Sequence, residues 1–269
     1  MPDWIIAAIL GIIEGITEFL PVSSTGHLLL AEHWLGRHQS DLFNIVIQCG
    51  AVIAVIPLFH KRFHQFLFQW REKATQDYLL KIAVAFVMTG AIGFALEKMH
   101  LILPDDKDDI LLPIGIAVLL GGVAFLAVEF WLRGKNLRDE ITWPIVIVVG
   151  VGQLVAAVFP GTSRSGATIV FALLLGLNRP LATEFSFLVG IPTMLAAGGW
   201  KIFKAFHHPL PGAKAENWTM VLISTAIAAV VSFIAVKWLL RYVQSHTFNA
   251  FGWYRIALGL VILALVLMK

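Results

Sequence analysis

The sequence predicts an all-α integral membrane protein with an inverted-topology repeat, two re-entrant helical hairpins and six full transmembrane helices. The chain has 269 residues, of which 58% are hydrophobic and 14% are charged, whereas a soluble domain has about 25% charged residues. Several apolar runs are long enough to cross a bilayer, and two further runs are interrupted by proline, glycine and hydroxyl residues. These observations indicate one polytopic membrane domain over residues 1–269.

Full transmembrane helices are expected where about 17–25 consecutive residues are predominantly apolar, because that length spans the hydrocarbon core. The runs that meet this condition are residues 42–59, 78–96, 111–131, 182–203, 218–240 and 250–268. The segment from Met1 to Leu20 is not expected to be a signal peptide, since it lacks a basic start and contains Glu14 and Glu18.

Two shorter apolar stretches are expected to form re-entrant hairpins at residues 4–35 and 143–177. In the first, the apolar pieces 4–19 and 26–35 are each too short to span the bilayer comfortably. The break between them contains proline, which ends a helix, and then serine, threonine and glycine, which form turns and helix caps. Irregular backbone at membrane depth is tolerated only where protein or a cavity surrounds it, so both breaks should be buried.

The two hairpins begin two similar halves of the chain, at about residues 1–131 and 143–269. At an offset of about 139 residues, Glu14 aligns with Gln153, Pro21 with Pro160, Ser23 with Thr162, and Ser24 with Ser163. Each half contains one hairpin and three crossings. Because three is odd, the second half should be inverted, and the two breaks should meet near the membrane midplane. Chance similarity between two broken apolar runs is the alternative explanation.

The distribution of Lys and Arg between the predicted loops indicates the orientation. Of 20 Lys and Arg residues, eleven fall on one face and seven on the other. The richer face should be cytoplasmic, which puts both termini and the mouth of the first hairpin outside. The seven residues of the outer face are Arg37, Lys98, Lys107, Lys201, Lys204, Lys214 and Lys269. No basic patch indicates a nucleic-acid partner, and no obligate protein partner is inferred.

The first break contains two carboxylates at helical spacing. Glu14 and Glu18 are four residues apart, so they share one helix face. Ionisable residues at membrane depth cost roughly 2.5–3.5 kcal/mol each on insertion scales, which makes them candidates for function. Two carboxylates suit Mg²⁺ or Ca²⁺, because Mg²⁺ sites commonly combine one or two carboxylates with substrate phosphates. The structural alternative is that both acids pair with Arg164 or form hydrogen bonds between helices.

Three hydroxyl residues and a histidine follow the acids. Ser23, Ser24 and Thr25 can cap the next helix, and the free N–H groups of a helix N-terminus also bind anions. Ser24 is a candidate nucleophile if His27, three residues on, takes its proton. Activation of a water molecule by His27 is the competing possibility, and a purely structural histidine is the simplest alternative.

The second break has the strongest anion-binding pattern in the chain. It is a glycine-flanked turn that opens a helix, and the guanidinium fork of its arginine matches two phosphate oxygens. The candidate binding residues are Gly161, Thr162, Ser163, Arg164, Ser165 and Thr168. If Arg164 only neutralises Glu14 or Glu18, the two breaks must still be in contact.

Together these groups favour phosphoryl transfer, in which catalysis is mostly positioning and charge neutralisation. A site inside the bilayer implies a substrate with a tail that stays in the lipid. Arg255, beside Trp253 and Tyr254, is expected to reach toward a membrane interface. Other polar residues within spans are expected to form interhelical hydrogen bonds. These residues are Asn44, Gln48, Gln153, Glu184 and Ser186.

Two segments resemble the undecaprenyl pyrophosphate phosphatase family of bacteria, the bacitracin-resistance type of integral membrane lipid diphosphatase. They are the run from Glu14 to His27 and the run from Pro160 to Thr168. The segment from Glu184 to Leu188 and the pair Tyr254-Arg255 extend the resemblance over nearly the whole chain.

The resemblance implies hydrolysis of the C55 isoprenyl diphosphate to undecaprenyl phosphate and inorganic phosphate in the cell inner membrane. This reaction recycles the lipid carrier of peptidoglycan and cell-wall synthesis. The resemblance also implies a divalent cation, Mg²⁺ or Ca²⁺, held by Glu14 and Glu18. Ser24 and His27 become candidates for the nucleophile and the acid/base, and Arg164 for the phosphate clamp. The remaining expected substrate-binding residues are Ser23, Thr25, Gly161, Thr162, Ser163, Ser165 and Thr168.

A secondary transporter or lipid flippase with a midplane anion site is the alternative function, because inverted repeats and broken helices are also transporter architecture. A phosphate-release assay on detergent-solubilised protein distinguishes the two, since a pure transporter releases no phosphate. A second family of membrane lipid phosphatases is not favoured, because no histidine closely follows Ser163 and Arg164.

Overall fold

The computed structural model describes residues 1–99, 101, 110–207 and 216–268. In chain order the helices are α1 (Asp3–Thr17), α2 (Ser24–Leu35), α3 (Asp41–Val55), the 3-10 helix η1 (Ile56–Phe59), α4 (His60–Phe68), α5 (Lys73–Lys98), α6 (Leu111–Trp131), α7 (Trp143–Val158), α8 (Arg164–Leu174), α9 (Arg179–His207), α10 (Trp218–Tyr242) and α11 (Asn249–Leu267). The described ranges contain no β-strand, although Arg138 and Leu177 form an isolated bridge. The predicted all-α class is confirmed.

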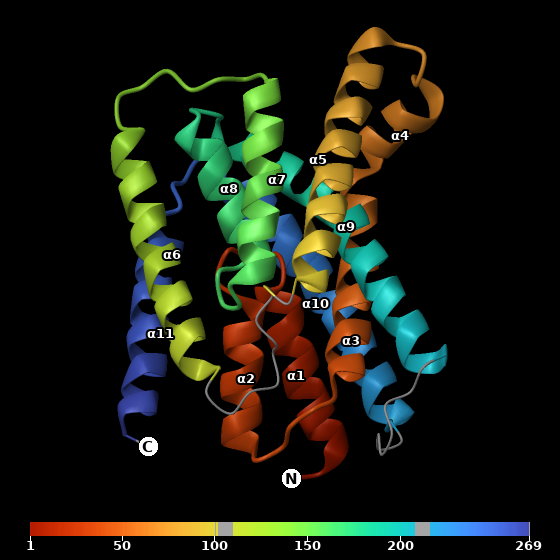
Figure 1. The fold of residues 1–269 in the computed structure, drawn as a ribbon, viewed down its shortest axis with the longest axis vertical. Coiled ribbons are helices and arrows are strands. Elements are labelled where there is room, and N and C mark those ends of the chain that lie inside the picture. Colours follow the sequence, from red (N-terminus) through yellow and green to blue (C-terminus); the bar gives the residue numbers. More distant parts are fainter. Residues whose placement is uncertain (100, 102–109, 208–215, 269) are drawn as a thin grey trace.

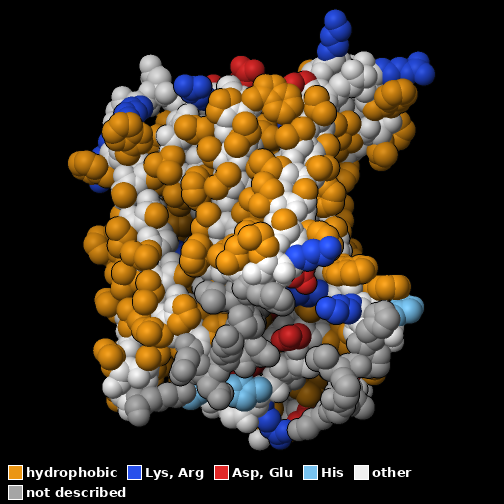
Figure 2. Space-filling model, viewed as in Figure 1, with side chains coloured by type: hydrophobic (Ala, Val, Ile, Leu, Met, Phe, Trp, Pro, Cys, Tyr) orange, Lys and Arg blue, Asp and Glu red, His pale blue; other side chains and the backbone are white. Residues whose placement is uncertain are grey.

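Six segments are long and apolar enough to cross a membrane. They are the continuous stretch Asp41–Phe68, which joins α3, η1 and α4, and the single helices α5, α6, α9, α10 and α11. Hydrophobic side chains cover most of the visible flank, whereas charged side chains gather at the top and in the lower part of the view (Figure 2). The protein is therefore a multi-pass integral membrane protein, as the apolar runs predicted.

Two pairs of short helices, α1–α2 and α7–α8, form hairpins. α1 and α2 have 15 and 12 residues, and α7 and α8 have 16 and 11. The first pair enters from the end of the molecule that holds both termini, and the second enters from the opposite end (Figure 1). Their breaks therefore face each other near the middle of the molecule, as expected for re-entrant hairpins.

The two halves of the chain interlock. Each has a short hairpin followed by three long helices, in the order α1-α2-α3-α5-α6 and then α7-α8-α9-α10-α11. α1 packs against α10 of the other half, and α7 packs in the same way against α5. α3 likewise contacts α10 while α9 contacts α5, and α6 pairs with α11. Equivalent helices of the two halves therefore make equivalent contacts with the other half.

Each break ends on a serine in the left-handed region of backbone conformation. Ser23 has a φ angle of 77° and Ser163 has one of 69°. Each hydroxyl accepts a hydrogen bond from a glycine N–H three residues on, Gly26 at 3.3 Å and Gly166 at 3.1 Å. The two serines are therefore equivalent caps. The predicted alignment of Ser24 with Ser163 was wrong by one residue, because the second break has one more residue between its proline and its cap.

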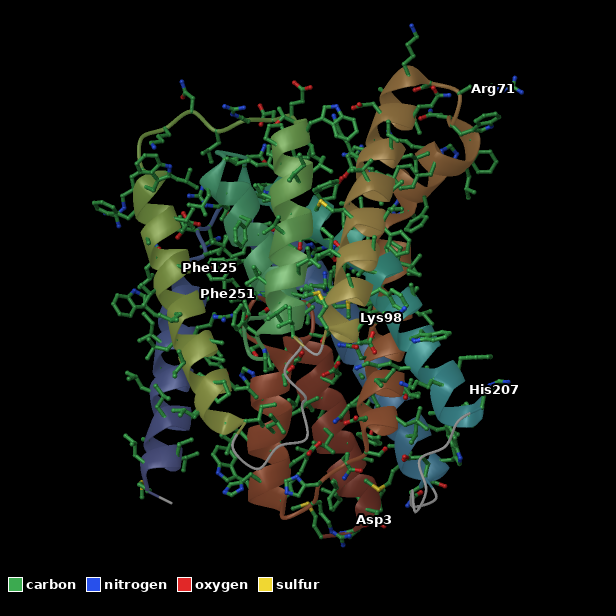
Figure 3. The ribbon with its side chains drawn as sticks, in the orientation of Figure 1. Asp3, Arg71, Lys98, Phe125, His207 and Phe251 are labelled. Carbon is green, nitrogen blue, oxygen red and sulfur yellow. The ribbon has the colours of Figure 1, made fainter. Side chains whose placement is uncertain are left out.

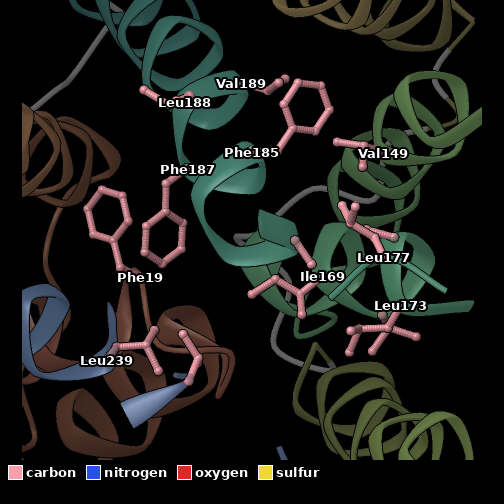
Figure 4. Close-up of a cluster of buried hydrophobic side chains, with 14 of the residues drawn as sticks. Phe19, Val149, Ile169, Leu173, Leu177, Phe185, Phe187, Leu188, Val189 and Leu239 are labelled. Atoms are coloured by element: carbon pink, nitrogen blue, oxygen red, sulfur yellow. The ribbon is translucent and has the colours of Figure 1, made fainter. Parts of the chain in front are cut away.

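Aromatic and branched side chains hold α9 against both hairpins. Phe19, in the first break, packs edge-to-face against Phe187 of α9 with ring centroids 5.1 Å apart, and both are fully buried. Ile169 and Leu173 of α8 belong to the same cluster (Figure 4). Inside a bilayer such packing stabilises through van der Waals contact rather than exclusion of water. α9 thereby joins the break of one hairpin to a helix of the other.

Both termini lie at the same end of the molecule (Figure 1). Asp3 is at this end and Arg71 is at the opposite one (Figure 3). Three of the residues predicted on the outer face, Lys107, Lys214 and Lys269, lie outside the described residues.

Candidate active site

The C-terminal end of α1 presents both predicted acids to the first break. The helix ends at Thr17, and the Glu18 N–H still donates to Glu14 O at 3.0 Å, so the two side chains face the same way. Both residues are buried, with 1% and 6% of their surface exposed. Glu14 Oε2 has no hydrogen-bond partner in the described part of the chain, which is uncommon for a buried polar atom.

Ser24, the first residue of α2, is hydrogen-bonded to the second acid. Ser24 Oγ donates to Glu18 Oε2 at 2.8 Å, and Gln48 Nε2 of α3 donates to the same oxygen at 3.3 Å. A carboxylate can only accept these two bonds. Glu18 is therefore oriented by two elements, and the hydroxyl of Ser24 already contacts a base.

Arg164, the first residue of α8, reaches across to the first break. Its Nη2 lies 4.0 Å from Glu18 Oε1, and its Nη1 donates to Ser186 O of α9 at 3.4 Å. Among the described residues, Nε and Nη2 of Arg164 have no hydrogen-bond partner. Nε and Nη2 form one edge of the guanidinium fork, so this edge can donate two parallel hydrogen bonds to a phosphate. The predicted contact between the breaks is present, and two of the three guanidinium nitrogens keep no hydrogen-bond partner in the described part of the chain.

Gly190 of α9 makes room for the Arg164 side chain. A Cβ atom at position 190 would collide with Nη1 and Cζ of Arg164. Any other residue would therefore displace the guanidinium from its place beside Glu18. Gly190 was missed from the sequence because a glycine in an apolar helix gives no local sign of what it faces.

The other hydroxyls of the second break are mostly bonded within the protein. Thr168 is fully buried, and its Oγ1 lies 2.5 Å from Ser186 Oγ of α9. Ser165 Oγ donates to Leu20 O of the first break at 3.3 Å, and Thr162 Oγ1 donates to Phe159 O at 2.7 Å. These bonds fix the position of the break relative to its neighbours. In the first break, Ser23 is the α2 cap, and Thr25 is only partly buried.

His27 is held by two partners, neither of which is Ser24. Its Nδ1 lies 2.6 Å from Ser23 O, and its Nε2 lies 2.6 Å from the hydroxyl of Tyr254 in α11. A carbonyl oxygen can only accept, so Nδ1 is the protonated nitrogen, and in the neutral ring Nε2 accepts from the Tyr254 hydroxyl. The two rings also stack, with centroids 5.7 Å apart and an interplanar angle of 4°. The geometry thus favours Glu18 over His27 as the group that takes the Ser24 proton.

Arg255 lies inside the bundle, and the prediction that it reaches toward an interface was wrong. None of its surface is exposed. Its guanidinium donates to carbonyl oxygens of α6 and of both breaks, at distances of 2.9–3.3 Å. The acceptors are Ala117, Val118, Pro21, Gly161 and Thr162. The sequence pattern did not show that Arg255 faces the inside of the bundle while its neighbours Trp253 and Tyr254 are exposed.

The polar residues inside the spans mostly bridge helices, as predicted. Besides Gln48 and Ser186, Gln153 Nε2 of α7 donates to Thr89 Oγ1 of α5 at 3.0 Å. Glu184 of α9 accepts from Arg62 Nε of α4 at 2.5 Å. Asn44 Oδ1 has no hydrogen-bond partner among the described residues.

Residues 7–261 match the family model described as Bacitracin resistance protein BacA. The chain belongs to this family.

Three relatives that cover nearly the whole chain bear the name undecaprenyl-diphosphatase. The protein of Rhizobium etli (strain CIAT 652) is 49% identical over 264 residues, which cover 98% of this chain and 97% of the relative. That of Xanthomonas euvesicatoria is 46% identical with the same coverage. That of Xylella fastidiosa (strain 9a5c) is 48% identical over 258 residues, 96% of each chain. The resemblance found in the two breaks therefore extends over nearly the whole length of all three.

The acidic pair of this BacA chain fits a hard divalent cation. Among the described residues no group of three or more His, Cys, Asp or Glu side chains gathers around one point. The carboxylates of Glu14 and Glu18 are the acidic ligands that the first break offers, and Glu14 Oε2 has no hydrogen-bond partner among the described residues. Mg²⁺ commonly uses one or two carboxylates and fills its other positions with water and substrate phosphate.

Proposed function

We propose that this protein hydrolyses undecaprenyl diphosphate to undecaprenyl phosphate and inorganic phosphate where the two hairpins meet. The name shared by its relatives supports the activity. The observation that supports the site is the alignment of three groups. Ser24 donates to one oxygen of Glu18, and the other oxygen faces the partly unsatisfied guanidinium of Arg164. A nucleophile, its base and an anion-binding fork thus lie together in a buried place.

In the proposed reaction, Ser24 Oγ attacks the terminal phosphorus while its proton passes to Glu18 Oε2. The bond between that phosphorus and the bridging oxygen breaks, and undecaprenyl phosphate leaves. Arg164 donates to the oxygens of the transferring group, where negative charge concentrates. Water then attacks the phosphorus of the phosphoserine, and the bond from that phosphorus to Ser24 Oγ breaks. Glu18 returns its proton to Ser24 Oγ, and inorganic phosphate leaves with both protons of the water.

Glu14 and Glu18 are the residues that would hold Mg²⁺ or Ca²⁺, which supplies positive charge to the diphosphate oxygens. Tyr254 orients His27 beside the N-terminus of α2. From this position His27 can activate the water that hydrolyses the phosphoserine. The alternative is a one-step reaction, in which His27 activates a water that attacks the diphosphate directly and no phosphoserine forms.

The protein is proposed to lie in the cell inner membrane with both termini and the active-site mouth on the periplasmic side. The end opposite the termini is rich in basic residues, which supports a cytoplasmic position for it. The basic residues predicted on this cytoplasmic face are Lys61, Arg62, Arg71, Lys73, Lys81, Arg133, Lys135, Arg138, Arg179, Lys237 and Arg241.

Phosphate release from undecaprenyl diphosphate by purified protein in detergent tests the function. Wild type should release phosphate and Ser24→Ala should release almost none. Acid quenching of the wild type, followed by mass spectrometry, should detect phosphate on the peptide that contains Ser24. A wild type that releases no phosphate but binds the lipid would favour the transporter. An active Ser24→Ala protein would overturn the role of Ser24 and favour direct attack by water.

A further inference from the structure

An apolar groove of about 570 Å³ runs between α6 and the α7–α8 hairpin. The α6 wall is a stripe of residues at helical spacing, three and four positions apart. Its members are Pro113, Ile116, Ala117, Leu120, Gly121 and Ala124. From Pro113 to Phe125 this wall extends over ~18 Å at 1.5 Å per residue. Phe125 is labelled on α6 in Figure 3.

The groove is open along its outer side. Leu120 on α6 and Phe159 at the end of α7 have 58% and 53% of their surface exposed, so they form an apolar rim that faces the lipid. Gly166 and Ala167 of α8 line the opposite wall and are too small to fill the space. A hydrocarbon chain could therefore enter sideways from the bilayer without crossing a polar surface.

One part of the groove wall belongs to the proposed active site. Thr162 in the second break and Gly166 in the first turn of α8 both line it, and Arg164, between them in sequence, faces Glu18. Arg255 also lines it and is bonded to carbonyl oxygens, with no ion pair to any described carboxylate. The groove is thus apolar along its length and reaches the second break at Thr162 and Gly166.

We propose that this groove binds the isoprenyl chain of the lipid diphosphate, beginning with the units next to the diphosphate. An amphiphile with an anionic head and an apolar tail matches an apolar wall that leads to the break carrying Arg164. The inference rests on the proposed function and goes beyond it by assigning the tail to one face of the bundle. Binding of the tail between α6 and α8 would hold the diphosphate at the N-terminus of α8.

Photo-crosslinking of the wild-type protein tests the location directly. The probe is an undecaprenyl diphosphate analogue with a diazirine on an isoprene unit near the head, and labelled peptides are identified by mass spectrometry. Label on α6 and α8, displaced by unlabelled undecaprenyl diphosphate but not by phosphatidylglycerol, supports the proposal. Label on other helices would overturn it. Equal displacement by both lipids would also overturn it, since the groove would then be a general lipid site.

A substitution that fills the groove tests whether the groove contributes to turnover of the lipid substrate. Ala124→Phe on α6 narrows the groove away from the break, and the matched control is Ala226→Phe, at an exposed position of α10. The filled variant should raise KM for undecaprenyl diphosphate at least about tenfold. It should leave hydrolysis of dimethylallyl diphosphate, with a single isoprene unit, almost unchanged. Equal effects on both substrates, or none on either, would contradict the proposal.

The two hypotheses fail in different ways. If the wild type releases phosphate from neither substrate, the proposed function fails. If it releases phosphate from both but the label avoids α6 and α8, only the tail site fails. The crosslinking result does not depend on the variant, so a poorly folded Ala124→Phe protein leaves that test in place.

Discussion

Ser24 and Glu18 are joined across the first break by a 2.8 Å hydrogen bond from Ser24 Oγ to Glu18 Oε2. Because α1 ends at Thr17 and α2 begins at Ser24, the reversal of the chain between them brings the acid and the hydroxyl together. The bond gives Ser24 a base from its own hairpin. His27, three residues further on, is instead engaged by Ser23 O and by Tyr254.

Glu18→Gln should nearly abolish turnover. The amide keeps the size of the carboxyl group but is a much weaker base, so kcat should fall by at least about 10²-fold, as expected for loss of a general base. Phosphate-release kinetics with undecaprenyl diphosphate measure the effect. Glu97→Gln, at an exposed position of α5, is the control and should be neutral. A Glu18→Gln kcat near that of the control would rule out Glu18 as the base.

Gly190→Ala should lower kcat by displacing Arg164. The added methyl group would overlap the guanidinium, and a shift of about 1 Å at a catalytic group costs on the order of 10²-fold. Gly199→Ala is a matched control on the same helix, because a Cβ atom there meets nothing within 4 Å. The comparison is made by kcat and by thermal unfolding of both variants. Equal kcat values would show that Arg164 need not occupy this position.

Arg255→Lys should destabilise the protein. The guanidinium bonds carbonyls of α6 and of both breaks, and an ammonium group cannot reach all of them. Hydrogen bonds from charged groups contribute about 1.5–3 kcal/mol each, so losing two of them predicts a loss of about 3 kcal/mol or more. Thermal unfolding in detergent, compared with the exposed control Arg133→Lys, measures it. Matching unfolding temperatures would mean that Arg255 does not hold the breaks together.

Tyr254→Phe should affect turnover only while His27 is present. The substitution keeps the ring stack and removes the hydroxyl that lies 2.6 Å from His27 Nε2. A double-mutant cycle with His27→Ala should therefore give a coupling energy of about 0.5–3 kcal/mol, the range for residues in direct contact. The quantity compared is kcat/KM for the four proteins. Simple additivity would indicate that Tyr254 does not act through His27.

Chelation should abolish phosphate release, and added Mg²⁺ or Ca²⁺ should restore it. Glu14→Gln should raise the cation concentration needed for half-maximal activity at least about tenfold, since a neutral amide is a weaker ligand for a hard cation than a carboxylate. Titration of chelated protein with Mg²⁺ measures this. Activity that survives thorough chelation would exclude a cation held by the acidic pair.

Much of the fold could be predicted because it depends on local patterns. The six spans follow from runs of apolar residues, and the two breaks follow from proline, glycine and serine within such runs. Glu14, Glu18, Ser24 and Arg164 stood out because charge and hydroxyl groups are rare in an apolar context. Their meeting at the middle of the bundle followed from the odd number of crossings in each half.

The sequence by itself determined the class of fold, the location of the breaks and the types of chemical group at them. Only the tertiary structure decided which groups touch. Arg255 bonds Pro21 O across 234 positions of the chain, Tyr254 bonds His27 across 227, and Gly190 makes room for Arg164. The physical reason is that periodicity and polarity report whether a residue is apolar and on which helix face it lies. The partner opposite that face depends on how helices from both halves pack.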